Sequence, residues 1–554
     1  MNRTFLFPRS RLRTAWAAAL LTLTGASVSA HEDHAPEAWK PTAYPDADAH
    51  APRPLADRVV LTWTADPARS QTVSWRTDTT VVRAIAEVAI AGENGRDLKP
   101  RTVTARTERF SSDLSDSHQH QATFADLLPD TLYAYRVGDG LNWTEWFHFR
   151  TASLEPRPFS FVYFGDAQND LKTHWSRVFR EAFRDAPRAA FTLHAGDLIN
   201  RANRDVEWGE WLGAPGWVNA TVPVVATPGN HEYFNDGSGP ESERRWKTKA
   251  GGELALTVQR EAIKDPAGQT TGYQLTARTE SGEVASATLT ADGAVEAVDG
   301  VFQALTGFQS EDLRGLTLEK GPVSDRIANP GVRTLSRHWR PQFAFPEVDL
   351  PEPLKETVYH LDYQGARIIS LNSNVLQKEQ VSWLREVLSN NPQRWTIVTF
   401  HHPIFSPARD RDNPQLRALW KPLFDEFKVD LVLTGHDHTY ARTGDISYKV
   451  GSKNVMEGTP AAYDPAIGTV YVVSVSGPKM YNITNDSFAV RTAEDTQLYQ
   501  VVQVSPEEIR YEARTAVGRL YDAFVLRKAG PGTPNQLIEV LPPERRRPRA
   551  ENVE

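Results

Sequence analysis

The sequence contains no cysteine among its 554 residues. This absence excludes disulfide bonds and thiolate metal ligands, so any metal site in the chain must use oxygen and imidazole ligands. A chain of this length can bury a core large enough to fold without covalent cross-links. The length also exceeds what one compact core needs, which predicts two or three domains.

Long apolar runs are also missing. The longest candidate lies in the first thirty residues, where four arginines without any acidic residue precede the run Ala15–Leu23 and the small residues Val28-Ser29-Ala30. This order is typical of a signal peptide, whereas a membrane anchor would need about 20 apolar residues. We therefore predict a signal peptide at residues 1–30, cleavage after Ala30, a secreted or periplasmic protein, and no transmembrane segment.

The balance of charge is acidic, with a formal net charge of −8. Nonspecific binding to nucleic acid depends on neutralising phosphates with basic residues, so we expect no nucleic-acid-binding surface. A phosphate-containing substrate is not excluded, because a bound metal ion can reverse the local charge. The sequence leaves the oligomeric state open.

Short alternating runs and turn residues predict the first folded domain. Residues 31–55 are rich in His, Pro, Ala and Asp and are predicted to be a linker. From residue 56 to 152, runs such as Thr72–Trp75 and Tyr133–Val137 alternate polar and apolar residues between Pro, Gly and Asp. This pattern favours a small antiparallel β-sandwich.

Residues 157–530 show a different pattern, in which apolar runs alternate with amphipathic stretches such as Trp175–Phe183 and Glu379–Leu388. This alternation is typical of an α/β domain. A polar segment at about 246–330 contains the strand-like runs Tyr273–Ala277 and Ala285–Thr290 and is interpreted as a β-rich insertion or lid. Residues 531–554 are predicted to be a disordered tail.

Five apolar runs of the α/β domain end abruptly in residue types that bind metals. Asp166 and Gln168 follow the run that begins at Phe159, and Asp197 follows the run that begins at Phe191. Asn230 and His231 follow the run from Pro223. His401 and His402 follow the run from Thr396, and His436 and His438 follow the run from Val429. In an open α/β sheet, the loops beyond the carboxyl ends of the strands face one crevice. We expect these side chains to meet there.

The mixture of ligand types restricts the metal. Asp, His and Asn together suit Fe, Zn or Mn, and there are more candidate ligands than one ion needs. Two metal ions that share a carboxylate can hold a phosphoryl group from both sides. Each motif alone is weak evidence, but the ordered set of five is specific.

The ordered motifs Gly-Asp-x-Gln, Gly-Asp, Gly-Asn-His-Glu, Val-x-x-His and Gly-His-x-His resemble those of the calcineurin-like metallophosphoesterase superfamily. The preceding segments Arg58–Trp75 and Leu127–Gly138 are similar to the fibronectin-type-III-like N-terminal domain of purple acid phosphatases. The resemblance covers about 57–151, 157–235 and 331–442, and leaves the insertion unmatched. It implies an α/β fold with a β-sandwich core flanked by helices, preceded by the all-β sandwich.

The resemblance also implies roles for single residues. It implies two metal ions, divalent or of mixed valence, with a hydroxide between them as the nucleophile. The first ion would be held by Asp166, Asp197 and His438, and the second by Asp197, Asn230, His401 and His436. His231 would stabilise the transition state or protonate the leaving oxygen, and His402 would lie near the substrate phosphate.

Three positions depart from the purple acid phosphatase pattern or leave alternatives open. Asn200 stands where those enzymes have an iron-ligating tyrosine, so we expect no purple colour, and Asn200 becomes a candidate for substrate binding. Gln168 either binds the first metal through its amide oxygen or forms a second-layer hydrogen bond. Arg201 either grips phosphate with its guanidinium group or is an ordinary surface residue.

These motifs and the resemblance predict a metal-dependent phosphoric ester hydrolase. The first interpretation is a phosphomonoesterase. A phosphodiesterase acting on nucleotides or phospholipid headgroups is the alternative, because the motifs do not separate the two. An inactive surface binding protein is a third interpretation, against which the intact set of ligands argues.

Overall fold

The computed structural model describes residues 43–235, 333–409, 411–445, 461–540 and 542–543, together with five strands between residues 243 and 298. The predicted signal peptide and its cleavage site, and residues 31–42 of the predicted linker, lie outside the described residues. None of the helices in these ranges is both long enough and apolar enough to span a bilayer.

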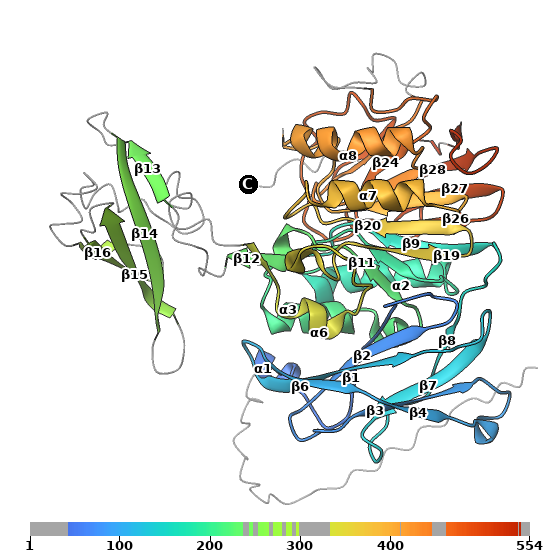
Figure 1. The fold of residues 1–554 in the computed structure, drawn as a ribbon, viewed down its shortest axis with the longest axis horizontal. Helices are drawn as coiled ribbons and strands as arrows, with labels where there is room; N and C mark the ends of the chain where they lie inside the picture. Colours follow the sequence, from blue (N-terminus) through green and yellow to red (C-terminus); the bar gives the residue numbers. More distant parts are fainter. Residues whose placement is uncertain are drawn as a thin grey trace, which may run out of the picture. The chain divides into compact units, whose positions relative to one another are not determined.

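The first domain is an antiparallel β-sandwich of two four-stranded sheets (Figure 1). One sheet has the order β1 (Asp57–Thr62), β2 (Gln71–Thr77), β6 (Asp116–Phe124) and β5 (Arg106–Ser111), and the other β4 (Arg101–Thr104), β3 (Ile85–Ile90), β7 (Leu132–Gly138) and β8 (Phe147–Arg150). Alternate residues of each strand point inward, so Val73, Trp75 and Tyr135 pack between the sheets. A 3-10 turn, η1 (Gly95–Asp97), connects β3 to β4.

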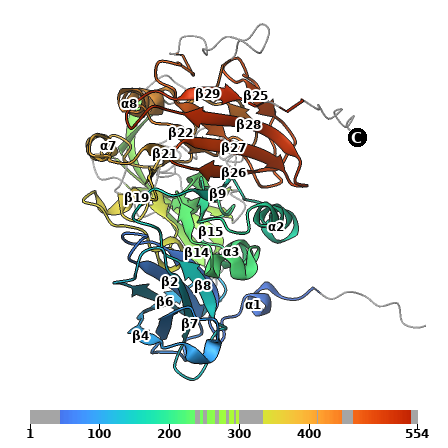
Figure 2. The same cartoon turned by 90° about the vertical axis from the view of Figure 1, so that its right-hand side faces the viewer.

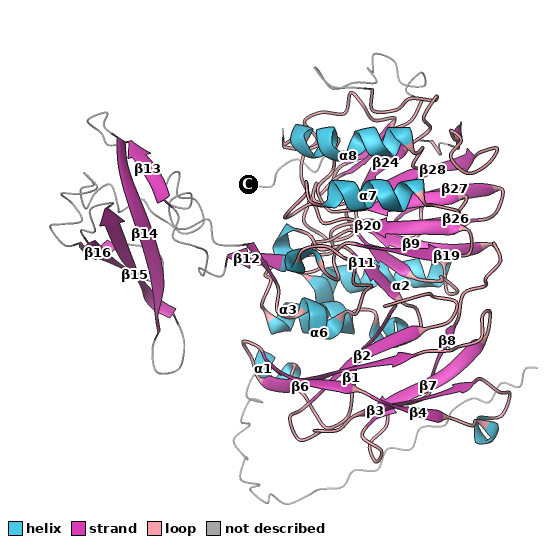
Figure 3. Cartoon of the chain, in the orientation of Figure 1, coloured by secondary structure: helices cyan, strands magenta, loops and turns pink. Residues whose placement is uncertain are grey.

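The second domain contains two seven-stranded mixed sheets (Figure 3). The first sheet runs β11 (Val224–Ala226), β10 (Thr192–His194), β9 (Phe159–Phe164), β26 (Leu498–Val504), β27 (Glu508–Thr515), β28 (Leu520–Arg527) and β29 (Gln536–Glu539). The second runs β19 (Tyr359–Tyr363), β20 (Ala366–Ser370), β21 (Trp395–Thr399), β22 (Leu431–Thr434), β24 (Val470–Val473), β23 (Tyr440–Arg442) and β25 (Arg491–Ala493). In both sheets, the strands that precede the predicted ligands are parallel to one another.

The alternation of side chains along the second sheet separates two apolar cores. Ile368, Leu431 and Leu433 point into the core shared with the first sheet. Ile369 and Val432 point to the other face, where they pack against α7 (Gln380–Ser389) and α8 (Pro414–Glu426). Helix α7 lies beside α8 in Figure 1.

Helices also cover the first sheet. Helix α2 (Ser176–Asp185) packs against β26 (Figure 2) and is preceded by a π-helical turn, η2 (Leu171–Trp175). Helix α3 (Asp205–Gly213) follows the loop after β10, and η3 (Gly216–Ala220) precedes β11. The remaining short elements are α1 (Asp46–Ala49), η4 (Asn230–Glu232), α6 (Trp339–Gln342) and η5 (Glu352–Leu354).

The insertion contains the predicted strands. β13 (Glu243–Lys247), β14 (Glu253–Lys264), β15 (Thr270–Thr279), β16 (Val284–Thr290) and β17 (Val295–Val298) pair antiparallel in that order. The strand-like runs at 273–277 and 285–290 lie within β15 and β16. Where the insertion leaves and rejoins the domain, β12 (Tyr233–Asn235) pairs with β18 (Arg333–Leu335).

One prediction about the segments between and after the domains was wrong where the structure describes it. The predicted disordered tail contributes β29 to the first sheet, where it pairs with β28. Composition misled there, because a few contacts with a preformed surface are enough to order a polar segment. The last part of the predicted linker forms α1, and His50 packs closely against Gly209 of α3. The other domain boundaries stay predictions.

Candidate metal centre

The five predicted ligand loops follow strands of two different sheets. Strands β9, β10 and β11 belong to the first sheet, and β21 and β22 belong to the second. The loops therefore come from both sheets of the β-sandwich core that the family resemblance implies, and not from one open sheet. The five loops meet where the carboxyl ends of both sets of parallel strands come together, and Asp166, after β9, bridges to Val475, after β24.

Unusual backbone conformations bring the ligands close together. Asp197 and His436 both adopt positive φ angles, of 51° and 71°. Such conformations cost free energy in residues other than glycine and are concentrated at functional sites. A side chain at Gly435 would place its Cβ 2.2 Å from Oδ1 of Asp166, so this position admits only glycine.

Four buried side chains form a first group of donor atoms. Nε2 of His438 lies 3.0 Å from Oδ2 of Asp166, and 2.9 Å from the amide nitrogen of Gln168. The same amide nitrogen lies 3.0 Å from Oδ2 of Asp197. The carboxylates of Asp166 and Asp197 and the imidazole of His438 are close enough together to hold one ion.

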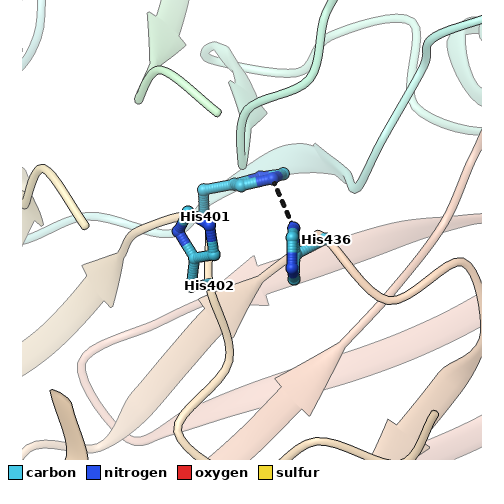
Figure 4. A group of neighbouring side chains, drawn as sticks. All are labelled: His401, His402 and His436. Atoms are coloured by element: carbon cyan, nitrogen blue, oxygen red, sulfur yellow. Dashed lines mark hydrogen bonds between the residues drawn. The ribbon is translucent and has the colours of Figure 1, made fainter. Parts of the chain in front are cut away.

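A second group of donor atoms shares Asp197 with the first. Nε2 of His401 lies 3.2 Å from Oδ2 of Asp197 and 3.0 Å from Oδ1 of Asn230. Nδ1 of His436 lies 2.8 Å from the same Asn230 oxygen and 3.2 Å from Nε2 of His401. Figure 4 shows this contact between His401 and His436. The oxygen Oδ2 of Asp197 therefore stands between the two groups.

Backbone carbonyls orient two of the imidazoles. Nδ1 of His401 donates to the carbonyl of Ala195 at 2.9 Å, and Nδ1 of His438 donates to the carbonyl of Lys479 at 2.8 Å. Each hydrogen bond fixes the tautomer in which Nε2 keeps its lone pair. In the neutral form of each histidine, the Nε2 lone pair then faces the other donor atoms of its group.

The charges of these groups influence one another strongly. Burial by itself lowers the pKa of His401, but the carboxylates of Asp197 and Asp166 outweigh burial and raise this pKa to about 9. Burial, together with His402 and His401, lowers the pKa of His436 far below its ordinary value. The site thus attracts positive charge while keeping His436 neutral, as a metal ligand must be.

Unsatisfied atoms indicate that the residues present suit a metal ion. Oδ2 of Asp166 and Oε1 of Gln168 are buried without a hydrogen-bond donor. Buried carboxylate and amide oxygens normally have a donor, so these two suit a cation. A half-turn of the Gln168 amide would place Oε1 beside Asp197 and His438, where a ligand is needed.

His231 lies at the edge of the centre. Its Nε2 is 3.9 Å from Oδ2 of Asp197, and its side chain is 27% exposed. Its Nδ1 lies 2.5 Å from the backbone carbonyl of Asn200. Asn200 therefore contacts His231 through the main chain, and not through the side chain that differs from the purple acid phosphatase pattern.

Glu207 of α3 fixes the loop that contains Asn200. Its carboxylate accepts the N–H groups of Asn200 at 2.8 Å and Arg201 at 2.7 Å, and it pairs with the Arg201 guanidinium at 2.7 Å. The Arg201 side chain is 62% exposed. The role of Arg201 in substrate binding stays a prediction. No motif in the sequence pointed to Glu207.

His402 lies with the second group. Its ring centre is 4.3 Å from that of His436 and 5.0 Å from that of His401 (Figure 4). Nδ1 of His402 lies 2.9 Å from the hydroxyl oxygen of Ser373. The same oxygen accepts the backbone N–H of His402. Ser373 was not found from the sequence, because it follows β20, which has no ligand motif.

Glu232, the last residue of Gly-Asn-His-Glu, connects two ligand loops. Its buried carboxylate accepts backbone N–H groups from Asp197, Leu198 and Ile199 in one loop and Gly229 in the other. Burial and the nearby charge of Asp197 raise the pKa of Glu232, whereas the N–H donors lower it. Since all four donors need acceptor lone pairs, we assign Glu232 as a carboxylate that holds the two loops together.

Family models match most of both domains. The model described as "Purple acid Phosphatase, N-terminal domain" matches residues 56–151, and "Calcineurin-like phosphoesterase" matches residues 159–272 and 329–440. The chain therefore contains a calcineurin-like phosphoesterase domain, preceded by a purple acid phosphatase N-terminal domain. This family depends on a binuclear metal centre and acts on phosphate esters, which agrees with the two groups of donor atoms that share Asp197.

Individual relatives are more distant. An uncharacterized protein of Mycobacterium tuberculosis is 29% identical over 159 residues, which cover 24% of this chain and 30% of that protein. A "Probable inactive purple acid phosphatase 1" of Arabidopsis thaliana is 19% identical over 430 residues, 74% of this chain and 57% of that protein. The chain thus matches only 30% to 57% of the length of these relatives.

Among solved structures, a purple acid phosphatase from yellow lupin seeds is similar. It has a TM-score of 0.56 and 16% identity, and the match covers 86% of this chain and 75% of that structure. This likeness confirms the predicted fold class: an all-β domain followed by a metallophosphoesterase domain with a β-sandwich core.

Proposed function

We propose that this phosphoesterase-family chain is an active phosphomonoesterase that uses two metal ions. The observation that carries the proposal is the position of Asp197, whose Oδ2 lies 3.0 Å from the Gln168 amide of one donor group and 3.2 Å from His401 of the other. A carboxylate in this position can bridge two ions. All seven predicted ligands lie in these two groups.

The residues that would hold the ions follow from the two groups. Asp166, Gln168, Asp197 and His438 would hold one ion, and Asp197, Asn230, His401 and His436 the other. When bound, such ions acidify a water molecule and neutralise charge on the phosphoryl group. Carboxylate, amide and imidazole ligands favour Fe, Zn or Mn, and the neutral Asn200 in place of a tyrosine favours divalent ions.

His231 has the arrangement of a general acid. Because its Nδ1–H donates to the carbonyl of Asn200, its Nε2 is the atom that gains and loses a proton. In the protonated state, Nε2–H can donate to the leaving oxygen of an ester held at the ions. His402 would contact the phosphoryl oxygens from the side of the second ion.

We also propose that the protein is exported. The order of basic, apolar and small residues before Ala30 supports this proposal. The N-terminus of protein recovered from the exported fraction should be His31. Recovery of intact Met1 from that fraction would contradict it.

Hydrolysis assays test the proposed function. The full chain is freed of metal with a chelator, reloaded with Mn, Zn or Fe, and assayed with phenyl phosphate and with bis(4-nitrophenyl) phosphate. We expect turnover of the monoester that is lost on chelation and restored by metal, and no strong visible absorption. Faster turnover of the diester would favour a phosphodiesterase, and no turnover of either ester with two bound ions would favour an inactive binding protein.

A further inference from the structure

A group of cations surrounds one tyrosine beside the metal centre. The Tyr481 ring packs on the ring of His438 with a distance of 4.4 Å between their centres. The guanidinium carbons of Arg409 and Arg411 lie 4.6 Å and 5.0 Å from the Tyr481 ring centre, and the Lys479 ammonium lies 5.6 Å from it. Such a concentration of positive charge is unexpected on a chain with a net charge of −8.

Backbone hydrogen bonds connect this group to the loop of His438. The carbonyl of Lys479 accepts Nδ1–H of His438, and the N–H of Tyr481 donates to the His438 carbonyl at 2.9 Å. A bridge between Ala408 and Ile483 joins the loop of Arg409 to the loop of Tyr481. The cations are therefore placed within one layer of contacts from a predicted metal ligand.

The three cations are not equivalent. Arg411 is committed to the structure, because it donates to the carboxylate of Asp437 at 2.8 Å and to the carbonyl of His436 at 2.7 Å. Arg409 is exposed and Lys479 partly exposed, and neither has an ion pair with a carboxylate in the described part of the chain. Arg411 thus orients the loop of His436, whereas Arg409 and Lys479 have no comparable carboxylate partner among the described residues.

We propose that Arg409 and Lys479 form an anion subsite that selects phosphate monoesters whose alcohol carries a second phosphate or carboxylate group. Guanidinium and ammonium groups bind both kinds of anion through charged hydrogen bonds. With one phosphoryl group at the metal centre, the second anion would lie beyond the Tyr481 ring, next to these two cations. This inference rests on the proposed function, whose site supplies the first anchoring point.

Three aryl esters test the selectivity. Phenyl phosphate, 4-carboxyphenyl phosphate and 1,4-phenylene bisphosphate are compared on the metal-loaded full chain and on the double variant Arg409→Gln/Lys479→Gln. For each ester that carries a second anion, we divide its kcat/KM by the kcat/KM of phenyl phosphate. We expect this ratio to be about tenfold lower in the double variant than in the wild type. Comparing ratios cancels the differences in leaving-group chemistry.

A matched control separates local from global charge. The double variant Arg83→Gln/Lys99→Gln removes the same two charges from exposed positions of the β-sandwich domain and should leave the ratios unchanged. A larger fall for the bisphosphate identifies phosphate as the second group, and a larger fall for the carboxylate ester identifies carboxylate. Equal ratios in the wild type and in Arg409→Gln/Lys479→Gln would overturn the subsite.

Binding measurements distinguish failure of the subsite from failure of the proposed function. Phenylphosphonate, 4-carboxyphenylphosphonate and 1,4-phenylenediphosphonate cannot be hydrolysed, and calorimetry on the metal-loaded chain gives their relative affinities. If no ester is cleaved but the Arg409→Gln/Lys479→Gln variant loses about tenfold of the preference for a second anion, the subsite stands without the enzyme activity. If the wild type and the variant show the same relative affinities for the three phosphonates, the proposed subsite is wrong.

Discussion

At the scale of the residue, Asp197 decides whether the site is binuclear. We expect Asp197→Asn to lower bound metal to one ion or fewer and turnover by more than about 100-fold, since losing a bridging ligand should cost more than losing a second-layer partner. Elemental analysis and phenyl phosphate hydrolysis measure both. The control Asp97→Asn removes an exposed carboxylate from η1 and should change neither quantity. Two retained ions with near-normal turnover would show that the ligand assignment is wrong.

Glu207 is expected to act through His231. Without its carboxylate the Asn200 loop loses two hydrogen bonds, so the carbonyl that orients His231 should shift. Glu207→Ala should lower kcat for phenyl phosphate about tenfold while both metal ions stay bound. The loss should be smaller for 4-nitrophenyl phosphate, whose leaving group needs little protonation.

The control for this prediction lies on the same helix. Glu210 of α3 has no hydrogen bond to the Asn200 loop among the described contacts, so Glu210→Ala should leave kcat unchanged. Loss of metal from Glu207→Ala would assign Glu207 a structural role in place of the positioning role.

At the scale of the element, β29 is fixed to its sheet by a buried ion pair. Arg442 is fully buried and donates to Glu539 of β29 at 2.8 Å and to Asp522 of β28 at 3.0 Å. Glu539→Gln should lower the free energy of unfolding by about 2 kcal/mol, because the buried guanidinium loses a charged partner. Urea titration measures this change. The exposed pair Arg527–Glu508 on the same sheet is the control, and Glu508→Gln should cost less than about 1 kcal/mol. Equal effects would contradict the assignment.

A histidine on β6 should make the sandwich sensitive to acid. Burial, with a smaller effect of His118, lowers the pKa of His120 from 6.5 to about 4, and its ring nitrogens contact the hydroxyls of Thr77 and Thr107. Above pH 6.5 the histidine is neutral in both states and the stability is complete. Between pH 6.5 and 4 the unfolded chain binds the proton first, so up to about 3 kcal/mol is lost.

Substitution isolates this contribution. His120→Gln should flatten the dependence of the unfolding free energy between pH 6.5 and 4, measured by urea titration at several pH values. His148→Gln, at an exposed position of β8, should keep the wild-type slope. An unchanged slope in His120→Gln would show that another group causes the acid sensitivity.

At the scale of the whole molecule, a buried cluster of charges connects the two domains. Asp205, at the start of α3, pairs with Arg58 of β1 at 2.6 Å and contacts His338 at 3.2 Å and Arg76 of β2 at 3.5 Å. The core of the second domain continues into the first through Val60 and Trp63. The two domains should therefore unfold together.

Asp205→Asn tests this connection. It leaves buried arginines without their charged partner, which should lower the free energy of unfolding by about 3 kcal/mol in one cooperative transition. Tryptophan fluorescence and circular dichroism should give coincident curves. Asp130→Asn, which removes the partner of Arg150 and Arg157 at an exposed site, is the control and should cost less than about 1 kcal/mol. A loss as small as that of the control would mean that the cluster does not couple the domains.

The order of apolar and polar residues was enough to predict the two domain types and most of the strands that precede the candidate ligands. The abrupt change from apolar strand to Asp, Asn or His marks a functional edge whatever the long-range contacts are. It was enough to predict seven candidate ligands, and the structure brings these side chains together. Their order along the chain also carried the family resemblance.

How these pieces meet could not be predicted from the sequence. That the five strands belong to two sheets, that Glu207 holds the loop behind His231, and that Arg409 and Lys479 stand together beside His438 all depend on contacts between distant segments. The strand β29 illustrates the reason. Its polar neighbours predict disorder, but the edge of β28 and the buried charge of Arg442 exist only once the sheet has formed, and together they order the segment.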